Sequence, residues 1–253
     1  NLPSFSVDTR RGRLVGTGSL SDYVLCWDCI NDKVRFAGAP PNGWKWWVRS
    51  QICDDETGKF WTCDSNDTKK YRLMSFDPEY NRFERYEVSP PENPYTHTIA
   101  TLRAHTDRPA MDGYYYWSAM NGAMFRFKPE SPDGPYVEYV GLNWDRGRDV
   151  LQFALSPSGR YIYYVPVGWT YEQNSPIIQF DVKTGKRKVL CWYRKYYFEK
   201  YGYWTGSTYA FEISKDGSFL VFCMNGEFQG EGKSYGHPAL FVVNIPEEER
   251  RED

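Results

Sequence analysis

The chain has 253 residues, a formal net charge of −2, and an aromatic content of 18% that includes 21 tyrosines and 10 tryptophans. The near-neutral charge gives no overall attraction to nucleic acid, so we expect no nucleic-acid partner. No apolar run approaches the ~20 residues that a membrane-spanning helix needs, so we expect no membrane span.

Short runs rich in β-branched and aromatic residues begin at the start of the chain, with turn residues between them. Within the first 39 residues these runs lie at 4–8, 13–17, 23–29 and 33–38. Such runs, bounded by Gly, Asp and Asn, are typical of β-strands. We therefore predict four antiparallel strands that pair in the order in which they occur.

The same four-strand pattern recurs about every 50 residues. One marker of the repeat is a glycine in the first turn, found at Gly12, Gly58, Gly113, Gly159 and Gly217. A second marker is the third strand, which reads YVLCWD, YRLMSFD, GAMFRFK, PIIQFD and PALFVVN. Four-stranded units at this interval are typical of the blades of a β-propeller. We predict an all-β propeller over 1–246, with blades at about 1–39, 49–88, 99–141, 149–192 and 207–245.

The blade motif, above all SPSGRYIYYV and SKDGSFLVFC, resembles the WD-like repeat of Tol-type periplasmic β-propellers. The resemblance extends over nearly the whole chain at the level of the repeat. It implies a fold and no particular activity. We favour an extracellular or periplasmic location, which the cysteines do not decide.

Two features stand apart from the repeat. A helical signal occurs at 194–201, where Gly202 would end the helix. The third strand of blade five is followed only by the charged tail 247–253, which we expect to fray, so blade five lacks its outermost strand.

Three arrangements would account for the incomplete blade. The chain belongs to a six- or seven-bladed propeller completed by a missing segment or a partner chain, closes as five blades, or pairs its open edge in an oligomer. We favour the first.

The surplus aromatic residues gather in the long loops that follow the second and fourth strands of the blades. Neighbouring antiparallel strands alternate in direction, so these loops should emerge on one side. Flat rings next to Arg, Lys and His suit sugars, because the ring covers apolar C–H groups and the cations pair with carboxylates. We predict binding of an acidic polysaccharide there. The expected substrate-binding residues are Trp44, Trp46, Tyr95, Trp144, Trp169, Tyr171, Trp204 and Tyr235.

Cleavage of the polysaccharide is a further hypothesis. Polysaccharide lyases use Arg to neutralise a uronate carboxylate while His or Tyr removes the neighbouring proton. The candidates for these roles are His97, His237, Arg146, Arg148 and Tyr193. The residues leave open whether the protein is an enzyme. The alternative is a non-catalytic protein-interaction module, whose rings fill gaps between blades or anchor a partner.

Neither a metal site nor a disulfide is expected. The three histidines lack zinc-motif spacing and no calcium loop is visible, so we expect no metal and no cofactor. A turn centred on Glu56 and Thr57 would place Cys53 opposite Phe60, leaving Cys63 about 10 Å along the strand, beyond disulfide reach. Cys26 and Cys29 should point to opposite faces. We predict free thiols.

Overall fold

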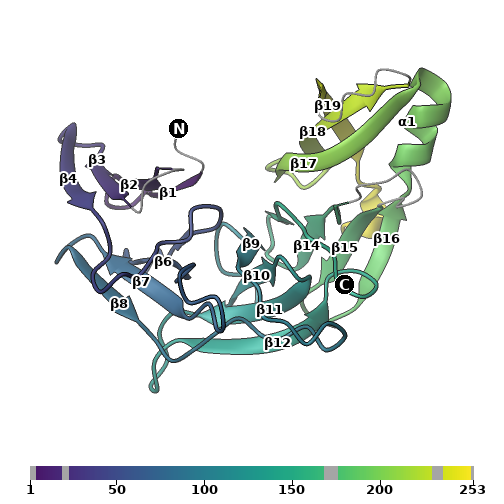
Figure 1. Ribbon diagram of the computed structural model, residues 1–253. Helices are drawn as coiled ribbons and strands as arrows, with labels where there is room; N and C mark the ends of the chain where they lie inside the picture. The colour runs from purple at the N-terminus through teal and green to yellow at the C-terminus, as the bar shows by residue number, and fades with distance from the viewer. Residues whose placement is uncertain (1–3, 19–22, 168–175, 230–235, 252–253) are drawn as a thin grey trace. The chain divides into compact units, whose positions relative to one another are not determined.

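The computed structural model describes residues 4–18, 23–167, 176–229 and 236–251 (Figure 1). The strands form five antiparallel sheets, and in each sheet the strands pair in the order in which they occur along the chain. Four sheets have four strands and the last has three. The predicted all-β propeller with five blades is therefore confirmed, and over the described residues blade five has three strands, as predicted. The chain divides into two compact units.

Unit 1, residues Asn1–Arg108 and Tyr115–Leu142, contains blades one to three. Blade one consists of β1 (Ser4–Asp8), β2 (Arg13–Thr17), β3 (Val24–Asp28) and β4 (Lys33–Gly38). Blade two consists of β5 (Ile52–Cys53), β6 (Phe60–Cys63), β7 (Leu73–Asp77) and β8 (Arg82–Arg85). Blade three consists of β9 (Leu102–His105), β10 (Tyr115–Ala119), β11 (Ala123–Lys128) and β12 (Tyr136–Leu142).

The core of unit 1 lies between its blades, where facing sheets bury apolar side chains against one another. One cluster joins blade one to blade two, with Val15 and Cys26 packed near Phe60 and Phe76. A second cluster joins blades two and three around Trp61, Trp117, Phe125 and Phe127. Blades one and two therefore each present an apolar face to the blade that follows.

Unit 2, residues Pro109–Tyr114 and Asn143–Asp253, contains blades four and five. Blade four consists of β13 (Ala154–Leu155), β14 (Tyr161–Tyr164), β15 (Ile177–Asp181) and β16 (Arg187–Cys191). Blade five consists of β17 (Tyr203–Ile213), β18 (Phe219–Phe228) and β19 (His237–Asn244). The helix α1 (Tyr193–Tyr201) connects the two blades, and the 3₁₀ turn η1 (Glu247–Glu249) follows β19. Figure 1 shows α1 beside β17.

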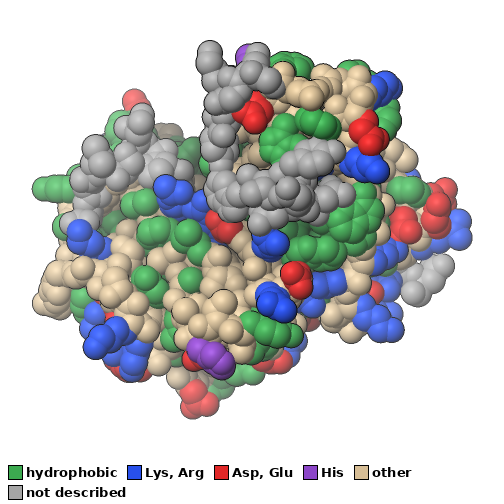
Figure 2. Space-filling view, turned by 45° about the vertical axis from the view of Figure 1, so that its right-hand side comes forward, with side chains coloured by type: hydrophobic (Ala, Val, Ile, Leu, Met, Phe, Trp, Pro, Cys, Tyr) green, Lys and Arg blue, Asp and Glu red, His purple; other side chains and the backbone are tan. Residues whose placement is uncertain are grey.

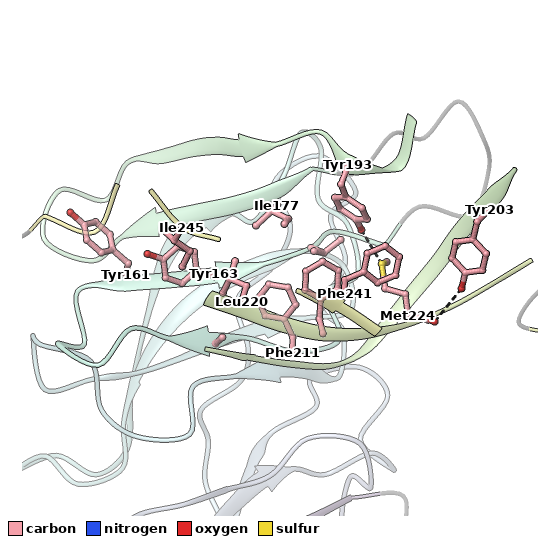
Figure 3. Packing of buried hydrophobic residues seen from close by; sticks show 13 residues of the cluster. Tyr161, Tyr163, Ile177, Tyr193, Tyr203, Phe211, Leu220, Met224, Phe241 and Ile245 are labelled. Carbon is pink, nitrogen blue, oxygen red and sulfur yellow. Dashed lines mark hydrogen bonds between the residues drawn. The ribbon is translucent and has the colours of Figure 1, made fainter. Parts of the chain in front are cut away.

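The core of unit 2 lies between blades four and five (Figure 3). Three rings of blade five stack in sequence: Phe211 on Phe222 at 5.1 Å between centroids, and Phe222 on Phe241 at 5.2 Å. Blade four contributes Tyr163 and Ile177 to the same cluster. Blade five therefore buries one face against blade four.

The recurring turn glycines have two structural roles. All five have a positive φ, between +60° and +80°, which an L side chain adopts only at a cost. Three of them also lie against the turn of the preceding blade. A Cβ at Gly159 would come within 2.8 Å of the Met111 backbone nitrogen, at Gly58 within 2.8 Å of the Arg11 guanidinium, and at Gly217 within 3.4 Å of Pro157. A glycine therefore recurs about every 50 residues because of blade-to-blade contact as well as turn geometry.

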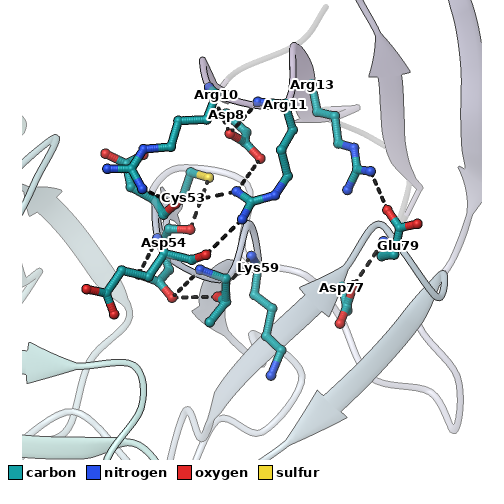
Figure 4. A network of polar contacts seen from close by, with 12 residues as sticks. Asp8, Arg10, Arg11, Arg13, Cys53, Asp54, Lys59, Asp77 and Glu79 are labelled. Atoms are coloured by element: carbon teal, nitrogen blue, oxygen red, sulfur yellow. Dashed lines mark hydrogen bonds and ion pairs between the residues drawn. The ribbon is translucent and has the colours of Figure 1, made fainter.

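Arginines of the first turn of blade one hold the first turn of blade two (Figure 4). The Asp8 carboxylate accepts hydrogen bonds from the backbone of Arg10 and Arg11, which forms the turn. Arg11 then donates to the carbonyls of Asp55 and Glu56. The contact links backbone to side chain across two blades and uses no residue of the long loops.

The other sequence predictions can be judged directly. The bounds of β1, β2 and β4 match the predicted strands. The helix forms with Gly202 as its left-handed C-cap, at φ 63°. Cys53 pairs with Phe60 as predicted. All six cysteines are free thiols, and burial raises the pKa of Cys26 to about 11 and that of Cys63 to about 12.

The charged tail differs from the expectation of fraying. The backbone carbonyl of Arg251 accepts a hydrogen bond from the Tyr161 hydroxyl at 2.7 Å, and that of Glu249 accepts one from the Gln179 amide at 2.8 Å. The Glu249 carboxylate also pairs with Lys188. We call residues 246–251 the C-terminal strap. It is ordered because buried polar groups of blade four use its backbone as hydrogen-bond partner.

Candidate functional site

The thirteen candidate site residues fall into three groups. Unit 1 contains Trp44, Trp46, Tyr95 and His97. Unit 2 contains Trp144, Arg146, Arg148, Tyr193, Trp204 and His237. Trp169, Tyr171 and Tyr235 lie outside the described residues. That all of them share one side of the propeller stays a prediction.

In unit 1 the tryptophan loop is largely part of the core. Trp46 is buried against Phe76 and Phe83, and its indole N–H donates to the Gln51 side chain at 2.9 Å. Trp44 is partly buried beneath the Arg85 guanidinium, which lies 4.9 Å from the ring centroid. The Trp46 ring therefore offers no surface to a ligand.

Tyr95 and His97 lie in an exposed turn that follows blade two. The Asn93 side chain forms this turn by accepting hydrogen bonds from the backbone of Tyr95 and Thr96. The His97 imidazole lies 3.0 Å from the Glu92 carboxylate, and the residue has a positive φ of 52°. This side chain is the most accessible of the candidate proton acceptors.

In unit 2 Tyr193 is also a core residue. Its ring packs against Phe222 and Phe241, and its hydroxyl donates to the Met224 sulfur at 3.2 Å (Figure 3). Burial raises the pKa of this phenol. A buried phenol with a raised pKa is poorly placed to remove a proton from a polymer, so its placement argues against the proposed catalytic role.

The loop that carries Trp144, Arg146 and Arg148 is shaped by one buried asparagine. The Asn143 side chain donates to the Arg148 carbonyl at 2.5 Å and accepts from the Arg148 backbone nitrogen at 3.0 Å. The Asn143 carbonyl in turn accepts a hydrogen bond from the Tyr164 hydroxyl of blade four. These bonds hold the loop closed, with Arg146 exposed on its outer side.

Trp144 of this loop meets Trp192, the residue before α1, at 6.0 Å between ring centroids and an angle of 70°. From there exposed rings continue along the helix at Tyr196 and Tyr201. Trp192, Tyr196 and Tyr201 are 48% to 53% exposed. We name Trp144, Trp192, Tyr196 and Tyr201 the aromatic band.

The helix exposes Tyr196 because its other side packs on blade five, whereas Tyr201 follows Tyr197 by one turn, contacts its ring at 5.7 Å and is exposed at the end of the helix. Tyr193 and Tyr197 contact Phe241, and Phe198 meets Trp204 of β17. Residues 196 and 200 are one turn apart on the opposite side, as helical periodicity requires. The partly buried Trp204 therefore belongs to the support of the band, and the buried Arg194 guanidinium, 5.7 Å from the Trp204 centroid, lies behind it.

Cations accompany the exposed rings. Lys200 donates to the Tyr196 hydroxyl at 2.7 Å and lies about 5 Å from the centroids of both Tyr196 and Tyr201. The hydrogen bonds to these two phenols raise the pKa of Lys200. In the space-filling view, hydrophobic side chains and lysine or arginine side chains lie next to one another on the face drawn (Figure 2). Such a surface can stack on a flat apolar group and attract an anion together.

The other two histidines have structural surroundings. His237 opens β19, and its ring packs against Phe228 at 5.4 Å between centroids. His105 of β9 lies edge-on to Trp117, and burial lowers its pKa. The expectation that an Arg and a His candidate lie within reach of each other stays a prediction.

The sequence interpretation missed Trp192, Tyr196 and Tyr201 as site residues, and Asn143 as the residue that shapes the loop. The available signal was the density of rings in CWYRKYYFEKYGYW, where five tyrosines, two tryptophans and a phenylalanine exceed what one short helix can bury. Over the described residues, three or more His, Cys, Asp or Glu side chains nowhere gather as a metal site would require. Within that same part of the chain, α1 and η1 are far too short and polar to cross a bilayer.

Comparison with known proteins supports the fold. No protein-family model and no curated protein sequence matches the chain. Among solved structures, hydrazine synthase of Kuenenia stuttgartiensis is similar at a TM-score of 0.62 and 10% identity, over 97% of this chain and 64% of that chain. This chain thus spans just under two thirds of that protein's length.

Two further structures are similar at the same level. The Cps50 (Swd1) β-propeller domain of Myceliophteria thermophila gives a TM-score of 0.55 at 8% identity, over 96% of this chain and 72% of that one. The dihydro-heme d1 dehydrogenase NirN gives 0.57 at 11% identity, over 96% of this chain and 46% of that one. These three proteins have unrelated names and identities of 8% to 11%, so the likeness establishes the propeller fold and no activity. A specific relation to Tol-type propellers is not part of these findings.

Proposed function

We propose that this protein binds an acidic polysaccharide through the aromatic band of unit 2. The observation that carries the proposal is the row of half-exposed rings at Trp192, Tyr196 and Tyr201, which continues from Trp144 and has cations beside it. Exposed rings of this size are costly to leave in water, and a sugar face covers such a ring without requiring a deep pocket.

The cations give the band its preference for acidic sugars. Arg146 extends from the loop that Asn143 holds, and Lys200 lies between two of the rings. A guanidinium can pair with a uronate carboxylate through two parallel hydrogen bonds, which an ammonium cannot. We therefore assign charge recognition to Arg146, and sugar stacking to Trp192 and Tyr196.

The proposal is binding without cleavage. Tyr193, the candidate base nearest to the band in sequence, has its hydroxyl bonded to Met224 inside the core. His97 lies in unit 1 and is paired with Glu92. A lyase needs a base within hydrogen-bond reach of the proton it removes, and these two placements give that idea little support.

Titration of purified uronic-acid oligosaccharides, followed by calorimetry, tests the proposal. Trp192→Ala should weaken binding at least about tenfold, or about 1.4 kcal/mol. Arg146→Ala should cost about 1.5–3 kcal/mol, the scale of a hydrogen bond to a charged group. Neutral oligosaccharides of the same length should bind the wild type less tightly than the acidic ones do. The Arg146→Ala variant should bind the neutral and the acidic oligosaccharides with equal affinity.

Matched controls come from unit 1. Tyr80 is exposed in the last turn of blade two and Arg82 is exposed at the start of β8, so Tyr80→Ala and Arg82→Ala remove a ring and a charge elsewhere. Both should leave the affinity unchanged. If no oligosaccharide binds, or if the two control variants lose as much affinity as the band variants, the polysaccharide proposal is wrong. Formation of an unsaturated sugar product would instead show that the protein cleaves its ligand.

A further inference from the structure

A small cavity lies in unit 2 between the first turns of blades four and five, against the C-terminal strap. Its volume is about 90 Å³. A cavity of this size holds a few water molecules or one very small organic molecule, since pockets for larger ligands measure roughly 300–1,000 Å³. We call it the strap cavity, and the residues that line it include Ser156, Ser158, Tyr161, Tyr163, Asp216 and Arg250.

The strap cavity has a buried floor and an exposed rim. Tyr161, Tyr163 and Ser156 are 7% exposed or less, and both tyrosines belong to the core between blades four and five (Figure 3). Ser158 and Asp216, which lie in the two turns, are exposed. The floor is therefore fixed by the core, and a small solute can reach the cavity at the turns.

Arg250 brings a positive charge to this cavity without a counter-ion. Among the residues that the structure describes, its side chain forms no ion pair, and its Nε is buried without a hydrogen-bond partner. The neighbouring Arg251 differs, because its guanidinium pairs with Glu247 at 3.7 Å. A buried N–H group without an acceptor is costly. An anionic group of a bound molecule would give the Arg250 guanidinium its partner.

The strap holds the backbone of Arg250 from both sides. The carbonyl of Glu249 accepts a hydrogen bond from Gln179, and the carbonyl of Arg251 accepts one from Tyr161, whose ring lines the cavity. The backbone on either side of Arg250 is thus tied to blade four. A site with its backbone fixed in advance loses less conformational freedom when a ligand binds.

Asp216 brings the opposite charge to the same cavity. Its Oδ1 accepts hydrogen bonds from the Ser214 hydroxyl and from the backbone and hydroxyl of Ser218. These bonds lower the pKa of Asp216, so the carboxylate is charged at neutral pH. Within the described part of the chain it forms no ion pair, with Arg250 or with any other cation. The strap cavity therefore presents two opposite charges that do not neutralise each other.

We propose that the strap cavity binds a small free α-amino acid, such as glycine, in its zwitterionic form. The carboxylate of the amino acid pairs with Arg250, and its ammonium group pairs with Asp216 at the rim. The hydroxyls of Ser156 and Ser158, 3.1 Å apart, provide further polar groups on the wall. A simple anion meets the repulsion of Asp216 and a simple cation that of Arg250, so a ligand with both charges fits best.

Titration of the full chain with glycine, followed by ligand-observed NMR, tests the proposal. Acetate and methylammonium are the comparison probes, because each carries only one of the two charges. Glycine should bind at least about tenfold more tightly than either, and Arg250→Gln should weaken glycine binding at least about tenfold, the scale of a hydrogen bond to a charged group. Arg251→Gln is the matched control, since it removes the neighbouring guanidinium, which pairs with Glu247 and does not line the cavity. It should leave the affinity unchanged.

Asp216→Asn tests the other wall and leaves the strap unaltered. It keeps a side-chain oxygen for the hydrogen bonds from Ser214 and Ser218 and removes the charge. Because Asp216 is exposed, the variant should fold, which circular dichroism checks for all variants. Glycine binding should weaken at least about tenfold, as for Arg250→Gln, and acetate should bind this variant more tightly than it binds the wild type. If Arg250→Gln does not fold, this variant alone decides.

Three results would overturn the proposal. Failure of glycine to bind the wild type would show that the strap cavity holds only water. Acetate binding as tightly as glycine would make the cavity an anion site that does not recognise the ammonium group. Equal losses in Arg250→Gln and Arg251→Gln, or no loss in Asp216→Asn, would place the bound amino acid elsewhere on the molecule.

Discussion

Two aromatic segments of this protein lie in equivalent positions and have opposite surroundings. The tryptophan loop 44–47 connects blade one to blade two in unit 1, and the segment 192–204 connects blade four to blade five in unit 2. In the first, Trp46 is buried in the core. In the second, Trp192, Tyr196 and Tyr201 remain half exposed. Aromatic density in a loop therefore does not reveal whether the loop packs or binds.

The difference lies in where the polar atoms of the rings find partners. In unit 1 the indole N–H of Trp46 donates to Gln51, and that of Trp47 donates to the Leu102 carbonyl at 2.6 Å. A buried ring with a satisfied polar atom is stable and specific. In unit 2 the segment forms α1, whose periodicity buries Tyr193, partly buries Tyr197 and turns Tyr196 outward. A helix on a sheet edge can bury only one of its sides.

The largest expected effect is on stability, and it is seen when one tryptophan ring is removed from each of the two segments in turn. Trp46→Ala should lower the free energy of unfolding by about 3–5 kcal/mol, because it leaves a cavity and a Gln51 side-chain oxygen without its donor. Trp192→Ala should change it by no more than about 0.5 kcal/mol. Denaturant unfolding measures both. Equal losses would show that the aromatic band is part of the core and not a binding surface.

A second comparison uses two turn glycines, one whose turn is open and one whose turn contacts the preceding blade. Gly113→Ala should cost about 1–2 kcal/mol, because its φ is +80° and nothing lies within 4 Å of the new Cβ. Gly159→Ala should cost about 1–3 kcal/mol more, since its Cβ would meet the backbone of Met111 at 2.8 Å. Thermal unfolding of the two variants compares them. Similar melting temperatures would mean that the contact between the turns yields easily.

A third prediction concerns Asn143, which holds the loop that carries Trp144 of the aromatic band. Asn143→Ala should destabilise the protein by about 1–3 kcal/mol, because two backbone groups of Arg148 lose their partner. It should also weaken polysaccharide binding, since Trp144 and Arg146 depend on the loop. Asn143→Asp keeps the side-chain acceptor and loses the donor, so its stability should lie between that of the wild type and that of Asn143→Ala. Unchanged binding in Asn143→Ala would remove this loop from the site.

The smallest expected effect concerns pH and unit 1. Burial lowers the pKa of His105 in the folded protein, so the unfolded chain binds the proton more tightly. The contribution of His105 to the free energy of unfolding is fully present above the unfolded pKa of about 6.5. It is lost as pH falls below that value, and the free energy of unfolding then changes by at most about 1.4 kcal/mol per pH unit. Unfolding measured from pH 7 to 5 should show this slope in the wild type and a weaker one in His105→Gln. Identical slopes would assign the pH dependence to other groups.

The repeat could be predicted from the sequence because its signals are local. A glycine such as Gly58 marks a turn of positive φ, and a run such as IIQFD marks a strand, whatever lies beside them. The disulfide-free cysteines followed from the same local register. The roles of individual rings did not follow, because they depend on the neighbouring blade. Trp46 could not be separated from Trp192 without knowing that the Gln51 side chain accepts the hydrogen bond of its indole N–H.

The candidate site shows the same limit. Arg146 and Trp144 were correctly assigned to one loop, since they are two residues apart. Tyr193 was taken as a reactive group, but the side of α1 that faces Phe241 is set by how the helix docks on blade five. Contacts of long sequence separation, such as that between Tyr193 and Met224, have no local signature.

The C-terminal strap also has a consequence for the order of events during synthesis. The Tyr161 hydroxyl finds its acceptor 90 residues later, at Arg251, and Gln179 finds its acceptor 70 residues later, at Glu249. Blade four therefore cannot complete its buried hydrogen bonds when its own strands leave the ribosome. It must wait until all of blade five and the strap have followed. During that interval blades four and five should mature as one cooperative unit, and a ribosome that stalls within β19 should expose both to proteases.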